Sequence, residues 1–211
     1  MADRAVVFVD GNNWFHAIRD IAVEDRGRLD YRVISQKLLG PRIWVGTRYY
    51  IGRVPQRSDT RLYAEQRRFL AALEAMDPRI STHLGRLEPR TVDSPAAREL
   101  QHYLAGLTRR IDTRVYHDLM QIARNHRHAE VMVEKAVDVM LAVDMVVRAE
   151  RNEFDAAYLL SADGDFTPAV TAVRSHGKKV YAVSPAPGAQ LASVVTSFIR
   201  LKREWFDDCY R

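Results

Sequence analysis

Three aspartates follow apolar runs at the positions where a strand would end. Asp10 comes directly after Ala5–Val9, and Asp163 and Asp165 follow Tyr158–Leu160 after a two-residue turn. Continuous apolar runs of this kind are typical of strands that are buried on both faces of a parallel sheet. Ligands bind beyond the carboxyl ends of such strands. We therefore expect these carboxylates to share one site.

Two more aspartates interrupt the apolar segment Glu134–Val147, which is predicted to be a helix that is buried nearly all round. Buried carboxylates without a partner cost several kcal/mol each. Asp138 and Asp144 are six residues apart, so they lie about 120° apart around a helix and do not share one small site. Their candidate partners are a cation, Lys135, an arginine or backbone donors. We expect Asp138 to be the ligand and Asp144 to be a structural partner.

Each of these residues also has a purely structural interpretation. Asp10 is a candidate turn residue, Asp165 a helix cap and Asp138 the partner of the neighbouring lysine. Asn13 is a candidate helix cap, and Ser161 a turn hydroxyl. The convergence of carboxylates from three segments favours a metal site, because such a cluster repels itself without a divalent cation. Oxygen ligands select Mg²⁺ or Mn²⁺ over zinc.

This sequence lacks the motifs of several enzyme classes. It contains no G-x-x-x-x-G-K-[ST] and no G-x-G-x-x-G, which argues against a P-loop enzyme and against a dinucleotide cofactor. It contains no Gly-x-Ser-x-Gly, and the single cysteine, Cys209, favours a reducing compartment, hence the cytoplasm. The longest apolar stretch, 136–147, is broken by aspartates, so we expect no membrane span.

Strands and helices are predicted to alternate along the chain, which indicates parallel βαβ units with helices on both faces of the sheet. We predict one domain over residues 1–211, with a helical insertion at about 89–128. The predicted strands are Ala5–Val9, Arg42–Val54, Ile80–Leu87, Asp155–Leu160 and Lys179–Val183. The predicted helices are Trp14–Ala22, Ser58–Met76, Glu134–Val147 and Pro168–His176.

The ordered set of polar motifs resembles the NYN domain family of PIN-like nucleases, from about Ala5 to Leu201. The motifs are Val7–Asn13, Glu134–Val139 with Asp144, Leu160–Phe166 and Gly177–Val180. There are two departures from the family pattern. Ala162 stands where glycine is usual, and Thr196 stands where many members have an acidic residue, so one outer ligand is expected to be missing.

The resemblance implies a three-layer α/β/α PIN-like (Rossmann-like) fold with a mainly parallel sheet, and an Mg²⁺- or Mn²⁺-dependent ribonuclease. Asp10, Asp138, Asp163 and Asp165 are similar to the acidic cluster of the family, and Asn13 to the asparagine of its first motif. We expect Asp10 and Asp163 to bind the ion directly, and Asp138 and Asp165 to complete the coordination or hold the attacking water. The expected substrate is single-stranded or flexible RNA, cleaved to leave a 5′-phosphate and a 3′-hydroxyl.

Ser161 and Asp144 are expected beside this cluster or the substrate. Two other functions stay open. One is a catalytically weak module on the same fold that binds RNA or protein. The other is a phosphatase similar to the haloacid dehalogenases, although Asn12 stands where those enzymes have a second aspartate.

The segment 86–128 carries eight arginines against five acidic residues, giving +3 of the formal +5 charge of the chain. Arg109, Arg110 and Arg114 are candidates for contacts with RNA phosphates. The alternative for this segment is a solvated surface or the contact of a homodimer, because arginine is also favoured at protein interfaces.

Overall fold

The sheet is built around β1 (Arg4–Asp10), the apolar run that the sequence predicts as a central strand. The computed structural model describes residues 2–56, 59–107 and 112–211. In this part of the chain seven strands pair in the order β4-β3-β2-β1-β5-β6-β7. The other strands are β2 (Ile43–Arg53), β3 (Ile80–Asp93), β4 (His128–Lys135), β5 (Ala156–Leu160), β6 (Lys179–Ser184) and β7 (Ser197–Arg200).

The sheet is mainly parallel, as predicted. β1 pairs in parallel with both β2 and β5, and the pairs β2–β3, β5–β6 and β6–β7 are parallel too. The chain builds outward from β1 to β2 and β3, and later outward on the other side through β5, β6 and β7. The strand order therefore reverses at β1, and the crevice outside the carboxyl ends at such a reversal is the usual ligand site of open parallel sheets.

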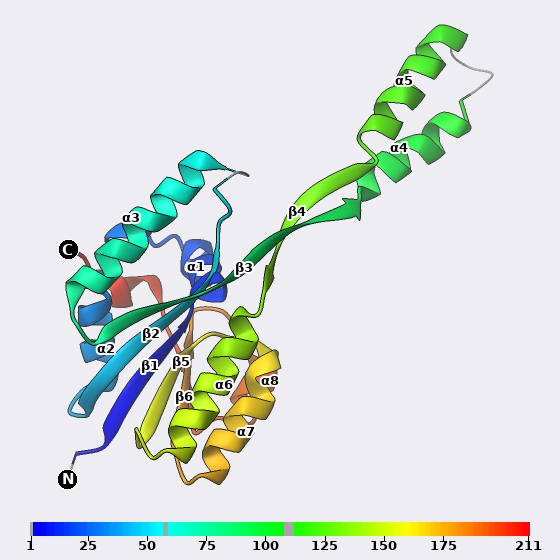
Figure 1. The fold of residues 1–211 in the computed structure, drawn as a ribbon. Coiled ribbons are helices and arrows are strands. Elements are labelled where there is room, and N and C mark those ends of the chain that lie inside the picture. Colours follow the sequence, from blue (N-terminus) through cyan, green and yellow to red (C-terminus); the bar gives the residue numbers. More distant parts are fainter. Residues whose placement is uncertain (1, 57–58, 108–111) are drawn as a thin grey trace. The chain divides into compact units, whose positions relative to one another are not determined.

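Helices cover both faces of the sheet, which gives the predicted three-layer α/β/α architecture (Figure 1). One apolar core joins the sheet to α1 (Gly11–Asp20), α2 (Tyr31–Leu39) and α3 (Thr60–Met76). A second core joins the opposite face to α6 (Val137–Glu150), α7 (Thr167–Ser175) and α8 (Ala189–Ala192). Alternate residues of β1 enter the two cores, so Val9 faces α1 and Phe8 faces α6. By the same alternation Asp10 points to the α6 side.

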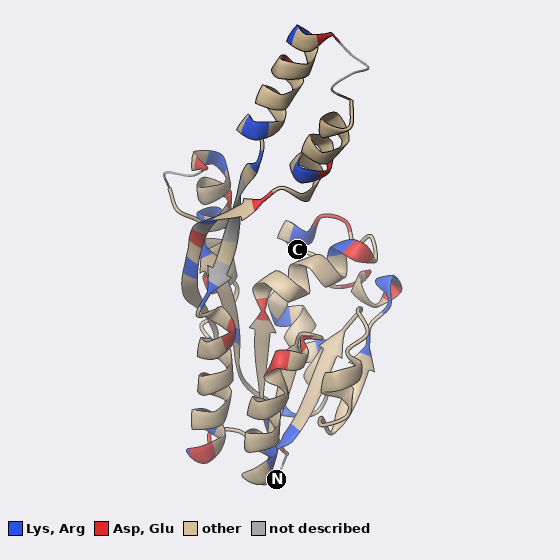
Figure 2. Ribbon diagram, turned by 90° about the vertical axis from the view of Figure 1, so that its right-hand side faces the viewer, with Lys and Arg blue, Asp and Glu red and all other residues tan. Residues whose placement is uncertain are grey.

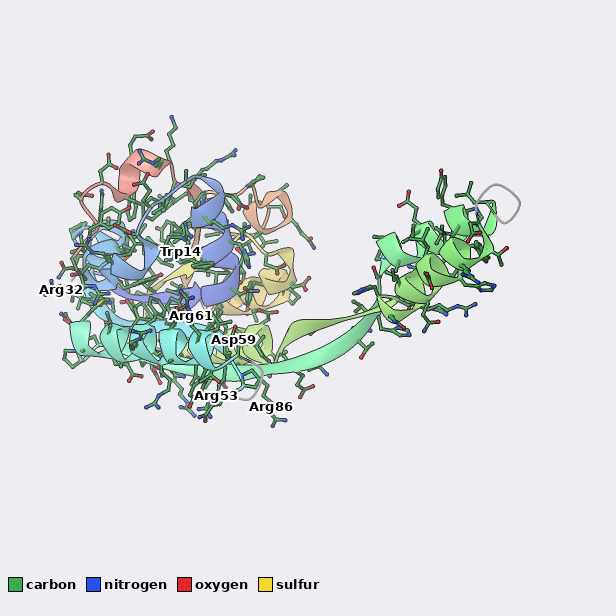
Figure 3. The ribbon with its side chains drawn as sticks, turned by 90° about the horizontal axis from the view of Figure 1, so that it is seen from above. Trp14, Arg32, Arg53, Asp59, Arg61 and Arg86 are labelled. Atoms are coloured by element: carbon green, nitrogen blue, oxygen red, sulfur yellow. The ribbon has the colours of Figure 1, made fainter. Side chains whose placement is uncertain are left out.

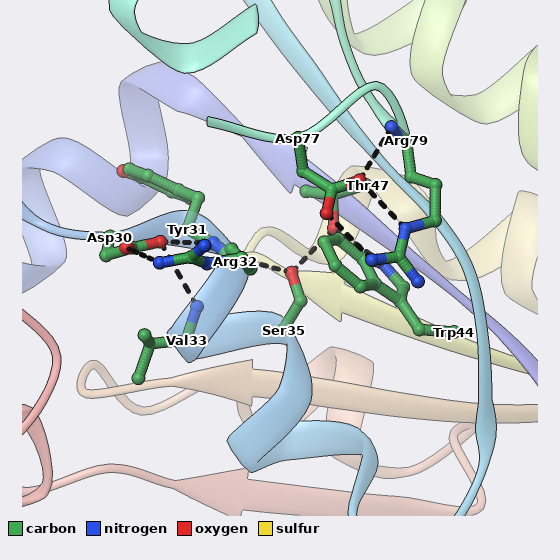
Figure 4. A network of polar contacts seen from close by, with 9 residues as sticks. All are labelled: Asp30, Tyr31, Arg32, Val33, Ser35, Trp44, Thr47, Asp77 and Arg79. Carbon is green, nitrogen blue, oxygen red and sulfur yellow. Dashed lines mark hydrogen bonds and ion pairs between the residues drawn. The ribbon is translucent and has the colours of Figure 1, made fainter. Parts of the chain in front are cut away.

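Helix α2 was not predicted from the sequence, and polar contacts explain its position (Figure 4). The Asp30 carboxylate caps its first turn by accepting from the backbone N–H groups of residues 32 and 33. The buried Ser35 hydroxyl lies 2.6 Å from the Thr47 hydroxyl of β2, which also accepts from the Trp44 indole at 3.1 Å. The helix is therefore fixed to the sheet by buried hydrogen bonds that an apolar pattern does not reveal.

Tertiary contacts divide the chain into two compact units. The larger unit comprises the chain up to Arg86 and from Glu134 onward, and the smaller is Leu87–Val133. The smaller unit contains two helices packed on each other, α4 (Pro95–Ala105) and α5 (Thr113–Asn125). Both carry basic and acidic residues (Figure 2).

The prediction for segment 134–147 was wrong in two respects. Lys135 ends β4, and Ala136 adopts a left-handed conformation with φ of 69°, so α6 begins only at Val137. The helix is not buried all round either, because the side chains of Val139 and Val143 are 66% and 54% exposed. Helix α8 and strand β7 were not predicted, since each is only four residues long. No helix in the described ranges has the length and apolar character needed to cross a membrane.

Candidate active site

Asp10 ends β1 at the carboxyl edge of the sheet and is almost completely buried, at 3% exposure. It is the N-cap of α1, a role that the sequence interpretation gave to Asn13. Its Oδ1 accepts from the Asn13 backbone N–H at 3.3 Å, and its Oδ2 accepts from the Ser161 hydroxyl at 2.9 Å. The Asp10 carboxylate is thus held at a defined orientation from two sides.

A short hydrogen-bond network joins this turn to the loop after β5. The Ser161 hydroxyl also accepts from the Asp163 backbone N–H at 3.1 Å, and the Asn13 side-chain oxygen accepts from the Ala162 N–H at 3.2 Å. Asp163 in turn caps the short 3₁₀ helix η2 (Gly164–Phe166), where its Oδ1 accepts from the Asp165 N–H at 2.9 Å. Asn13 and Ser161 therefore hold the two motif loops together rather than serving only as local caps.

Glycine is required at the first of these turns. A Cβ added to Gly11 would lie 2.6 Å from the backbone oxygen of Tyr50 and 2.6 Å from the Tyr49 ring of β2. Such distances are incompatible with van der Waals contact. The turn that carries Asp10 can approach β2 only because residue 11 has no side chain.

Asp138 belongs to the same acidic region. It lies in the first turn of α6, a helix that contacts η2. Partial desolvation and the negative charges of Asp163 and Asp165 raise the pKa of Asp138. The α6 side of the carboxyl edge is also the side to which Asp10 points, and Ser161 joins Asp10 to the loop that carries Asp163.

The chemistry of this region suits a hard divalent cation, although the side chains do not enclose one position. The donors are carboxylate oxygens, which Mg²⁺ and Mn²⁺ prefer. Within the described ranges, no three His, Cys, Asp or Glu side chains are arranged as a metal-ligand group. Both oxygens of Asp10 and one of Asp163 accept local hydrogen bonds instead. A cation beside Asp138 would offset the repulsion between its carboxylate and those of Asp163 and Asp165.

Asp144 is held in a separate ion-pair network farther along α6. Its Oδ2 accepts from the Arg48 guanidinium and from the Tyr50 hydroxyl, and its Oδ1 accepts from Arg148 Nε at 2.9 Å. Burial opposes ionisation, but these donors lower the pKa of Asp144. Six residues along a helix correspond to about 9 Å of axial rise. Asp144 therefore connects α6 to β2, as a structural partner of arginines.

One neighbour of the acidic region was missed from the sequence. A Cβ on Gly164 would collide with the side chain of Gln190, which comes from α8. The Gln190 amide therefore lies against the turn between Asp163 and Asp165. A four-residue helix has too little periodicity to be recognised, so no sequence signal identifies this residue.

Two exposed arginines lie farther along the neighbouring strands and face the α3 side of the sheet, as Ile51 and Leu84 do. Arg53 of β2 and Arg86 of β3 are direct cross-strand partners, three residues beyond the level of Asp10, and both are exposed. Figure 3 shows them close together near the start of α3. Of the predicted RNA contacts, Arg109 and Arg110 lie outside the described residues, and Arg114 is exposed in the first turn of α5.

The interpretation of Thr196 as a missing outer ligand was wrong. Its hydroxyl accepts from the Val180 backbone N–H at 3.0 Å, and its own N–H donates to the Val180 carbonyl at 2.7 Å. Val180 is the second residue of β6, so Thr196 lies toward the amino ends of the strands. A side chain there is separated from the acidic region by most of the strand length.

Comparison with known proteins gives one family and one similar fold. The chain matches the NYN domain family over residues 4–202. A solved structure of a protein of unknown function from Vibrio parahaemolyticus RIMD 2210633 is 16% identical, with a TM-score of 0.56. The match covers 99% of this chain and 96% of that one, and at this identity it shows a common fold only. A search of curated proteins finds no match.

Proposed function

Since the chain belongs to the NYN domain family, a group of PIN-like nucleases, we propose that it is a ribonuclease that depends on Mg²⁺ or Mn²⁺. The family supports a nuclease-type function. The observation that carries the proposal is the link between acidic residues of separate segments: Ser161 bonds both the Asp10 carboxylate and the Asp163 N–H, and partial desolvation with the charges of Asp163 and Asp165 raises the pKa of Asp138.

In this proposal Asp10 and Asp163 would hold the ion, and Asp138 and Asp165 would complete the site or orient water. A divalent ion bound there would lower the pKa of water and stabilise the charge that develops on the phosphate. The hydrogen bonds from Ser161 and the Asn13 N–H fix the orientation of Asp10, which reduces the cost of assembling the site.

The test compares wild type with Asp163→Asn on end-labelled single-stranded RNA in Mn²⁺, in Mg²⁺ and in EDTA. We expect fragments with 5′-phosphates from wild type in either metal, and a loss of at least 100-fold in rate for the variant, typical of removing a preorganised catalytic group. Asp118→Asn, on an exposed position of α5, is the matched control and should cleave normally.

Two further measurements separate the proposed function from the alternatives. Mn²⁺ should raise the melting temperature of wild type more than that of Asp163→Asn, because a ligand that binds only the folded state stabilises it. A chromogenic phosphate monoester should not be hydrolysed. RNA binding without cleavage in both metals would contradict the ribonuclease and support a binding module, and release of monoester phosphate would support a phosphatase.

A further inference from the structure

A hollow of about 500 Å³ lies at the carboxyl ends of β6 and β7. One wall is basic and is formed by Arg200, at the end of β7, with Lys202 and Arg203 directly after it. Ile21 and Pro185 line the remainder, together with Leu201 and the carboxylate of Glu204. Three cations against one carboxylate give the hollow a positive charge.

The hollow lies on the same edge of the sheet as the acidic region. Leu159 of β5 is level with Ala182 of β6, and Ser184 is level with Arg200. Ser161, which holds Asp10, is two residues beyond Leu159 and is therefore level with Ser184. With neighbouring strands about 4.8 Å apart, the Cα atoms of Ser161 and Arg200 are separated by about 10 Å.

The two arginines of this wall are oriented by backbone carbonyls. Arg200 Nε donates to the Pro185 carbonyl at 3.3 Å, and Arg203 Nε donates to the Ala22 carbonyl at 3.2 Å. Within residues 2–56, 59–107 and 112–211, neither Arg200 nor Lys202 forms an ion pair, and the contact of Arg203 with Glu24 is long, at 4.0 Å. Arginine side chains held in this way are typical phosphate ligands, and lysine binds phosphate as a point charge.

We propose that this hollow binds backbone phosphates of the RNA strand on one side of the scissile bond, an inference that rests on the proposed ribonuclease function. A strand whose scissile phosphate lies at Asp10 and Asp163 reaches Arg200 across the ends of β5 and β6. Contacts to phosphate read no bases. The hollow therefore sets the path of the strand without selecting its sequence.

The experiment measures binding of a short fluorescent oligouridylate by anisotropy, in EDTA and in an Asp163→Asn background, so that cleavage does not interfere. The test variant adds Arg200→Gln and Lys202→Gln. The matched control adds Arg151→Gln and Lys179→Gln, which remove the same charge at the opposite, amino-terminal edge of the sheet. Urea unfolding midpoints of both variants check that the fold is retained.

We expect the test variant to bind roughly 25-fold more weakly at 0.1 M salt, with a log–log salt slope flatter by about 1.4, the electrostatic contribution of two single-strand phosphates. The control should bind as the background protein does. Unchanged affinity and slope in the test variant would overturn the inference, as would an equal loss in both variants, which would reflect net charge alone. RNA cleavage by the wild-type protein in Mn²⁺ is scored separately, so failure of the hollow is distinguishable from failure of the ribonuclease.

Discussion

Replacing Asp144 by asparagine should destabilise the fold strongly while sparing the acidic region. The carboxylate of Asp144 accepts from Arg48, Arg148 and Tyr50, and its side chain is 23% exposed. Asparagine keeps the size but removes the charge, and it turns an N–H toward groups that also donate. Breaking a fully buried ion pair costs about 3–5 kcal/mol. Because all three charged groups are partly exposed, we take the lower end of this range and expect the free energy of unfolding to fall by about 3 kcal/mol.

The assay is urea unfolding followed by circular dichroism, with thermal unfolding alongside. A loss of about 3 kcal/mol lowers the melting temperature by roughly 6–12 °C in a chain of this size. Glu65→Gln is the matched control, because its pair with Arg61 is solvent-exposed and should contribute under about 0.5 kcal/mol. Well below the melting temperature, Asp144→Asn should still cleave RNA. A free-energy change under about 1 kcal/mol, or loss of cleavage by a folded variant, would refute the assignment of Asp144 to a structural network.

Three other predictions concern the first turn and the amino edge of the sheet. Asp10→Asn should abolish cleavage and leave thermal stability in metal-free buffer unchanged or slightly raised, because it relieves repulsion in the acidic cluster; a large loss of stability would show instead that its hydrogen bonds dominate. Gly11→Ala should lower the free energy of unfolding, measured in urea, by about 2 kcal/mol or more, because the new Cβ would lie 2.6 Å from a backbone oxygen of β2. Gly27→Ala is the control and should lower it much less, because no atom lies within 4 Å of the added Cβ. The hydrogen-bonded ion pair with Arg4 lowers the pKa of Asp155 to about 2. The pair therefore stabilises the fold fully above about pH 4, and this stabilisation is lost as the pH falls toward 2. Between pH 6 and pH 2.5, Asp155→Asn should lose less stability than wild type, and an equal loss in the two proteins would contradict the pairing.

Local patterns were sufficient to identify the architecture. The run Ala5–Val9 is short, β-branched and aromatic, and apolar without alternation, which is typical of a strand buried on both faces. The alternation of these runs with amphipathic segments then specifies a parallel sheet with two helical layers. Elements without a clear pattern were missed. Helix α2 is positioned by the hydrogen bond between Ser35 and Thr47, and α8 has only four residues.

The acidic residues were visible in the sequence because a charge that ends or interrupts an apolar run is costly unless it has a partner. The same reasoning separated Asp138 from Asp144 by their angle around the helix. Spacing along the chain does not identify the side chains that pair with these aspartates. Arg48 is almost a hundred positions from Asp144, and only the packing of α6 on β2 brings the two together.

By itself, the sequence determined the family, the layers and the set of candidate carboxylates, because these depend on residue type and on spacing along the chain. Only the tertiary structure decided which edge of the sheet each polar group occupies. It placed Thr196 toward the amino ends of the strands and Arg200 at the carboxyl edge, although the two are four residues apart. The physical reason is strand direction and register, since four residues along a strand cover about 13 Å and cross most of the sheet.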